Sequence, residues 1–107
     1  MEWTSATIDE VKKIIEADLK NCDKEQIATF ESYAVQPYRA PILRYEKLES
    51  VVVVARRGTE VMYWDDVEEG FNISRVAEDG MVVDSGANQD DLAVALSAWR
   101  KPQAPGR

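Results

Sequence analysis

The densest group of chemically active side chains is the carboxylate run Asp65, Asp66, Glu68 and Glu69. Carboxylate oxygens suit Ca²⁺ or Mg²⁺, but the spacing is not that of an EF-hand loop and has no alternating acidic pattern. The run also suits recognition of a basic protein surface, because opposite charges attract and steer partners. The simplest interpretation is a solvated connection between strands. Four carboxylates with no Lys among them repel one another, which argues against a connection whose only role is to keep the protein soluble.

The residue types available for catalysis are few. The chain has no histidine, so the commonest general base is missing. Its one cysteine, Cys22, cannot complete a tetrahedral zinc site without histidine, and no GxGxxG or Walker pattern occurs. Cys22 also follows the end of a predicted helix, whereas a reactive thiol favours a helix N-terminus, so we interpret it as a packing residue. We predict a protein that is not an enzyme, with no catalytic residues, no cofactor and no metal.

Two large aromatic residues stand directly before the carboxylates. Tyr63 and Trp64 are neighbours in a predicted strand, so their side chains point to opposite faces of the sheet. If the face away from the helices is uncovered, one of them suits an interface with a partner or with a second copy of the chain. The predicted partner-binding residues are therefore Asp65, Asp66, Glu68, Glu69, Tyr63 and Trp64.

Charge and length narrow the classes of function. The net charge is −7, and residues 60–91 hold ten acidic residues with only Arg75 to oppose them. Nucleic acid is therefore a disfavoured partner, because phosphate contacts need Lys and Arg. The length of 107 residues predicts one domain over 1–101, followed by a flexible tail at 102–107. No apolar run approaches the ~20 residues of a membrane span, and no secretory signal is evident, so we expect a cytoplasmic protein.

The carboxylates and aromatic residues must be positioned by a sheet. Residues 48–58 contain four consecutive valines, whose β-branching favours a strand, and an unbroken apolar run implies that both faces are covered. We predict that this strand is central. The Arg56-Arg57-Gly58-Thr59 segment then turns the chain, and residues 60–64 return as the hairpin partner.

The first half of the chain is predicted to begin with a helix over residues 8–20. Thr7 and Glu10 match a capping box, and apolar residues recur on one face. Residues 24–28 have the pattern of one more helical turn, whereas residues 29–35 have the composition of a strand.

The segment that follows contains two prolines. Pro37 and Pro41 predict an edge strand or irregular segment, because proline cannot donate to a ladder. Residues 42–45 are then expected to begin the long valine strand, with a bend or bulge near Lys47.

The second half predicts further strands and a helix. The strands fall at 61–64, 71–76 and 81–84, with a turn at 78–80. Asn88 is the expected N-cap of a helix that ends at residues 100–101 before Pro102. The fold class is α+β: an antiparallel meander of four to five strands, flanked by N-terminal and C-terminal helices packed on one face.

Four short segments of the sequence also resemble segments of known proteins. They are 53–58 (Val-Val-Ala-Arg-Arg-Gly), 63–71 (Tyr-Trp-Asp-Asp-Val-Glu-Glu-Gly-Phe), Asp79-Gly80 and Asn88-Gln89. With these runs, residues 25–100 resemble a group of small uncharacterised bacterial proteins. In size, charge and layout such proteins are similar to immunity proteins of toxin–immunity pairs. The resemblance implies a bacterial binding protein and supplies no catalytic residues.

These observations lead to three functional hypotheses. The first is an acidic binding protein, of the immunity type, whose carboxylates occlude a basic partner. The second is a homo-oligomeric structural or housekeeping protein with Tyr63 or Trp64 at the interface. The third is a metal-dependent enzyme that uses carboxylates. None of them involves nucleic acid or a membrane.

Overall fold

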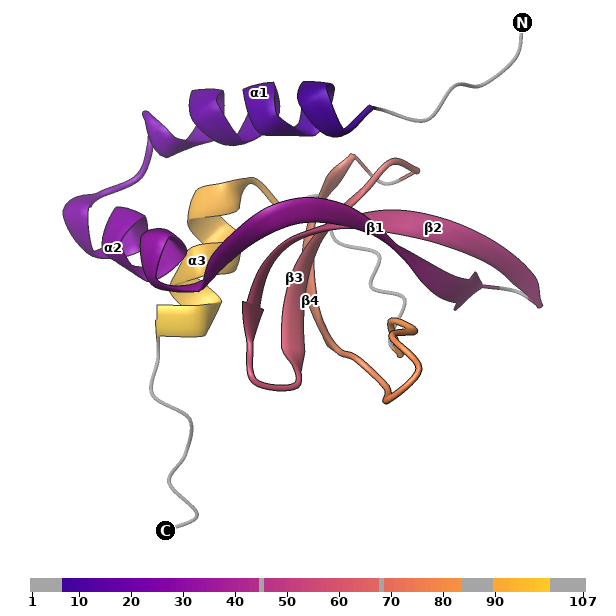
Figure 1. Ribbon diagram of the computed structural model, residues 1–107. Coiled ribbons are helices and arrows are strands. Elements are labelled where there is room, and N and C mark those ends of the chain that lie inside the picture. The colour runs from indigo at the N-terminus through magenta and orange to yellow at the C-terminus, as the bar shows by residue number, and fades with distance from the viewer. Residues whose placement is uncertain (1–6, 45, 68, 84–89, 101–107) are drawn as a thin grey trace, which may run out of the picture.

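The computed structural model describes residues 7–44, 46–67, 69–83 and 90–100, without the side chain of Arg100. The elements in chain order are α1 (Ile8–Leu19), α2 (Lys24–Tyr33), β1 (Ala34–Arg44), β2 (Lys47–Arg57), β3 (Glu60–Asp65), β4 (Gly70–Arg75) and α3 (Leu92–Arg100) (Figure 1). The strands form one antiparallel sheet in the order β1-β2-β3-β4. The predicted α+β meander, with helices before and after it, is confirmed.

Strand β2 lies inside the sheet and is covered on both faces, as its apolar run predicts. Residues 51–55 are fully buried. Val52, Val54 and Ala55 contact one apolar cluster, whereas Val51 and Val53 contact another. A bulge between Val53 and Ala55 in the pairing with β3 breaks the strict alternation of faces. The sheet therefore lies between two separate hydrophobic cores.

The helices cover one of these two faces. The first core joins the sheet to all three helices, and Figure 1 shows the helices gathered on one side of the strands. Its largest contacts include an edge-to-face pair between Trp64 and Phe71, whose ring centroids lie 5.1 Å apart. Among the described residues, no helix is long and apolar enough to cross a membrane.

The opposite face is covered by the segment 76–83, drawn in orange below the strands in Figure 1. A turn at Gly80 reverses this segment, and Val82 then bridges both Val76 and Ile42 of β1. The predicted fifth strand at 81–84 is thus reduced, in the described part, to a single bridge residue. Val82 is only 1% exposed, so this segment closes the second core instead of widening the sheet.

Each of the first two helices begins with a capping box. The predicted box of α1 is present: Thr7 Oγ1 accepts from the Glu10 amide, and Glu10 Oε1 accepts from the Thr7 amide. The box of α2 joins Asp23 and Gln26 in the same way. The prediction of a strand at 29–35 was wrong over most of its length, because α2 continues to Tyr33 and buries Phe30 against the first core.

Residues 42–45 do not begin the valine strand, which corrects the second prediction for this region. Residues 42–44 end β1, and the chain reverses near Glu46, whose φ is +64°. Strands β1 and β2 therefore form a long hairpin in which Leu43 lies opposite Leu48. Pro37 and Pro41 lie in β1 at one end of the strand order, as expected for residues that cannot donate to a ladder.

Helix α3 begins later than predicted. The expected N-cap, Asn88, lies outside the described residues, as does the tail at 102–107. Asp91 precedes the helix, and its Oδ1 accepts from the Val94 amide at 3.0 Å, which is capping geometry. Asp18 of α1 accepts from the Leu92 amide at 3.0 Å, so α1 also fixes the start of α3.

Candidate functional site

The predicted site lies where β3 passes into β4, and its first carboxylate is buried. Asp65 is 0% exposed. Its Oδ2 accepts from Arg44 Nη1 at 2.5 Å, and its Oδ1 accepts from the Val67 amide at 2.9 Å. Arg44 also pairs with Glu49 at 2.8 Å. Asp65 thus joins the β3–β4 connection to the end of the β1–β2 hairpin.

Arg44 is held in its charged form at this position. Burial alone lowers the pKa of Arg44, but the hydrogen bond and charge of Asp65, together with Glu49, outweigh burial and raise the pKa above its ordinary value. The Arg44 guanidinium is therefore a cation next to the buried Asp65 carboxylate.

The second carboxylate makes a second tie to the hairpin. Asp66 Oδ2 accepts from Arg39 Nη1 at 3.2 Å, and the Asp66 side chain is 4% exposed. Arg39 Nη1 also lies 3.4 Å from the Ser50 hydroxyl, across the strand pair. Two of the four predicted carboxylates are therefore buried next to arginines and do not form an exposed acidic patch, which corrects that picture of the site.

The remaining carboxylates of the run differ from the first two. Glu69 is exposed, with φ at +56°, and its amide donates to the Asp65 carbonyl at 2.7 Å. Glu68 lies outside the described residues. In the described part of the connection, Glu69 is the carboxylate directed to solvent.

Tyr63 and Trp64 do point to opposite faces, as their positions in the strand predict. Tyr63 belongs to the core under segment 76–83, and Trp64 belongs to the core under the helices. Both side chains are buried, Tyr63 fully and Trp64 with 9% exposure. The condition under which one of them would suit an interface is not met, because segment 76–83 covers the face that the helices leave open.

The exposed apolar side chains near the site are instead on the hairpin. Leu43 is 55% exposed and Leu48 is 67% exposed, and the two are cross-strand partners at its end. Val67, in the connection itself, is 53% exposed. Glu46, at the hairpin turn, is exposed as well.

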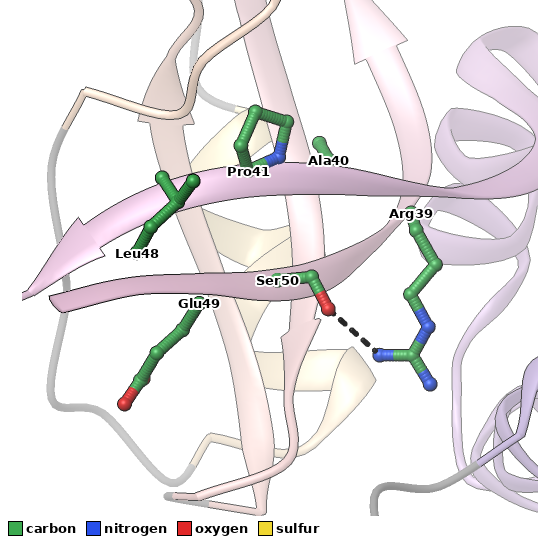
Figure 2. Close-up of a pocket in the computed structure, with 6 residues that line it drawn as sticks. All are labelled: Arg39, Ala40, Pro41, Leu48, Glu49 and Ser50. Atoms are coloured by element: carbon green, nitrogen blue, oxygen red, sulfur yellow. Dashed lines mark hydrogen bonds between the residues drawn. The ribbon is translucent and has the colours of Figure 1, made fainter.

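A shallow hollow of about 500 Å³ runs along this hairpin. It is lined by Arg39, Ala40, Pro41, Leu48, Glu49 and Ser50. In Figure 2 the Ser50 hydroxyl and the Arg39 guanidinium point toward each other at one end, whereas Leu48 and Pro41 lie farther along the two strands. The hollow offers an apolar surface next to paired charges.

In the part of the chain that the structure describes, the candidate site does not bring metal ligands together. No three carboxylate or cysteine side chains there come together in a way that could hold a metal ion. Asp65 and Asp66, the closest in sequence, are directed to different arginines of β1.

Sequence reasoning missed Arg39, Arg44, Leu43 and Leu48. The sequence contains only weak evidence for the hairpin that carries them, because the turn between β1 and β2 has no glycine and the prolines of β1 obscure its strand pattern. Comparison of the chain with protein-family models, curated proteins and solved structures gave no match.

Proposed function

We propose that this chain is a non-enzymatic binding protein of the bacterial cytoplasm, an immunity-type inhibitor that occludes a basic surface of its partner. The proposed contact surface, which we call the hairpin face, consists of Leu43, Glu46 and Leu48 of the hairpin with Val67 and Glu69 of the connection. The observation that carries the proposal is the pair of exposed leucines at the hairpin end.

The two arginine–aspartate pairs give the hairpin face its rigidity. Arg39–Asp66 and Arg44–Asp65 fasten the connection to β1, so two segments far apart in sequence are held together. Residues fixed before binding lose less conformational entropy when a partner docks. In this proposal Asp65 and Asp66 position the surface, and the exposed side chains make the contacts.

The composition of the hairpin face resembles that of known interfaces. Apolar residues at the centre and charged residues at the rim are the usual anatomy of a protein–protein contact. Leu43 and Leu48 supply the apolar part, and exposed Glu46 and Glu69 supply two negative charges against the positive charge of exposed Lys47.

Charge selects the kind of partner. The chain carries a net charge of −7, and its exposed rim carboxylates favour a partner of opposite sign. Complementary charge increases the association rate and excludes wrong partners, while apolar burial holds the complex together. A basic active site or a basic nucleic-acid-binding surface on another protein has the required chemistry.

The test is affinity capture from native bacterial lysate with three baits: the wild-type chain, Leu48→Asp, and Val94→Asp as control. Val94 is an exposed valine of α3, so its replacement adds the same charge away from the hairpin face. We expect one basic protein to be retained by wild type and by Val94→Asp, to be lost with Leu48→Asp, and to be released at high salt.

Three results would contradict the proposal. The first is equal retention by Leu48→Asp and wild type, and the second is a partner that is itself acidic. The third is capture of this chain alone by a bait that sediments as a dimer, which would favour the homo-oligomer instead. Sedimentation of wild type and Leu48→Asp separates this case, because a dimer formed through the leucines would dissociate in the variant.

A further inference from the structure

A row of alternating charge crosses three strands at the other end of the hairpins. Arg57 of β2 lies opposite Glu60 of β3, and Glu60 lies opposite Arg75 of β4. Arg57 Nη2 pairs with Glu60 Oε1 at 2.8 Å. One carboxylate thus stands between two guanidinium groups, and the row carries a surplus of one positive charge in a chain whose net charge is −7.

Several contacts fix the position of the Arg57 side chain without using all of its N–H hydrogen-bond donors. Its guanidinium carbon lies 5.1 Å from the Trp99 ring centroid and 5.7 Å from that of Tyr33. Its Nη1 donates to the Trp99 carbonyl at 2.6 Å. With the Glu60 pair, these two hydrogen bonds use two of the five N–H donors of a guanidinium.

A hollow opens over this row. Its volume is about 490 Å³, and it is lined by Arg57, Gly58, Thr59, Glu60 and Arg75. Gly58 has φ of +62°, and the space where its side chain would stand is open. Arg75 and Thr59 are exposed, so a guanidinium and a hydroxyl donor accompany Arg57 at the surface of the hollow.

We propose that this hollow is a binding site for a carboxylate group, carried by a small organic acid or by an acidic side chain of a peptide. The planar guanidinium matches a carboxylate with two parallel hydrogen bonds. One added carboxylate continues the alternation of the row and neutralises its surplus charge. A phosphate dianion would leave an excess negative charge next to Glu60, so charge matching selects the monoanion. This site is independent of the hairpin face.

The test is a titration of ¹⁵N-labelled protein, followed by NMR, with the monoanion butyrate, with an acetylated tetraglutamate peptide and with phosphate, at constant ionic strength. We expect saturable shifts of the amides of residues 58–60 and 75 and of the Arg57 Nε–H with both carboxylate probes. Phosphate should bind more weakly. Tighter binding of the peptide at equal carboxylate concentration identifies a peptide as the source, and equal binding identifies the small acid.

The matched variants are Arg75→Gln and Lys47→Gln. Arg75 lines the hollow, whereas Lys47 is an exposed cation at the opposite end of β2. Arg75→Gln should weaken binding about fivefold, as for loss of an exposed charge pair, and Lys47→Gln should leave it unchanged. Both residues are exposed, so unchanged spectra elsewhere show that the variants are folded. Equal weakening in both variants, or shifts that chloride reproduces, would overturn the proposal.

Discussion

At Asp65, burial and pairing act on the same carboxylate. Removing a charge from water is costly, and the cost is recovered only while its partner stays in place. Asp65 is 0% exposed and pairs with Arg44, whose side chain is 10% exposed. Asp65→Asn keeps the shape but puts a neutral amide against Arg44 Nη1, so that Arg44 keeps its pair with Glu49 and loses its pair with the fully buried carboxylate. We expect a loss of about 3 kcal/mol in the free energy of unfolding, measured with urea.

The control for that variant is Glu69→Gln in the same connection. Glu69 is exposed, so neutralising it should change the free energy of unfolding by less than about 0.5 kcal/mol. Similar losses in the two variants would mean that Asp65 is no more than a solvated carboxylate.

Cys22 is expected to be an inert thiol. Burial, followed by the charges of Asp18, Asp91 and Asp23, raises the pKa of the Cys22 thiol, and its Sγ lies 3.5 Å from the Asp18 carbonyl oxygen. At pH 8 the folded protein should react with a disulfide reagent several times more slowly than the urea-unfolded chain, because the thiolate is the nucleophile.

The raised pKa of the Cys22 thiol also makes the stability of the fold depend on pH. The folded state keeps the thiol proton to higher pH than the unfolded state, so the contribution of Cys22 is complete below the unfolded pKa and is lost as the pH rises toward the folded value. Cys22→Ser should reduce this alkaline loss of stability. Equal labelling rates of folded and unfolded protein would contradict the account of Cys22.

At the scale of the element, α1 depends on its capping box. Thr7→Ala should lower the free energy of unfolding by about 1 kcal/mol, because a capping side chain satisfies an amide that the helix leaves unpaired. The backbone and side-chain hydrogen bonds of Thr7 lower the pKa of Glu10. Thr7→Ala keeps the backbone hydrogen bond and removes the side-chain one, so NMR titration of the Glu10 carboxyl should give a pKa only part of the way back to its ordinary value.

The pH dependence of the box follows from the same lowered pKa. Its contribution is present above the ordinary pKa of glutamate and is lost as the pH falls through the folded value. Thr29→Ala is the control for Thr7→Ala, because the Thr29 hydroxyl donates to the Glu25 carbonyl within α2 and takes no part in the capping box of α1. An unchanged Glu10 pKa in Thr7→Ala would show that the Thr7 side chain does not help to hold the carboxylate.

The central part of β2, residues 51–55, has no face on which a charge is tolerated. Val53 is fully buried under segment 76–83, so Val53→Asp should cost several kcal/mol, measured by urea unfolding. Val94→Asp places the same charge on a side chain that is 53% exposed and should cost little. A mild effect at Val53 would mean that segment 76–83 does not seal the second core.

The sequence predicted the elements whose signal is local. The valines of β2, the capping box of α1 and the turn at Gly58 each carry their signal within a few residues. Only the first part of α2, residues 24–28, was predicted as helical, although Asp23 and Gln26 have capping-box spacing. Phe30 and Tyr33 have strand propensity, but packing against the helix-side core decides their conformation.

The side-chain geometry around the carboxylate run could not be predicted from the sequence. The carboxylate run marks the connection, yet sequence alone does not show that Asp65 meets an arginine 21 residues earlier. Burial of Tyr63 depends on a segment that follows it by more than a dozen residues. Long-range pairing of this kind follows from topology, which local patterns do not encode.

At the scale of the whole molecule, the two ends of the sheet differ in charge. The connection and the hairpin end hold exposed carboxylates beside paired arginines, whereas the turn at residues 57–60 with Arg75 carries a positive surplus. The chain therefore offers two surfaces of opposite character, and the central claim concerns the first: a basic partner docks on the hairpin face.

The most direct test of that claim is hydrogen–deuterium exchange of the chain, alone and bound to the basic protein retained in capture. The account predicts slower exchange on binding at residues 43–48 and 67–69, with no change in the exposed turn at 58–59. Protection confined to the helices or to residues 57–60, with the hairpin unaffected, would contradict it.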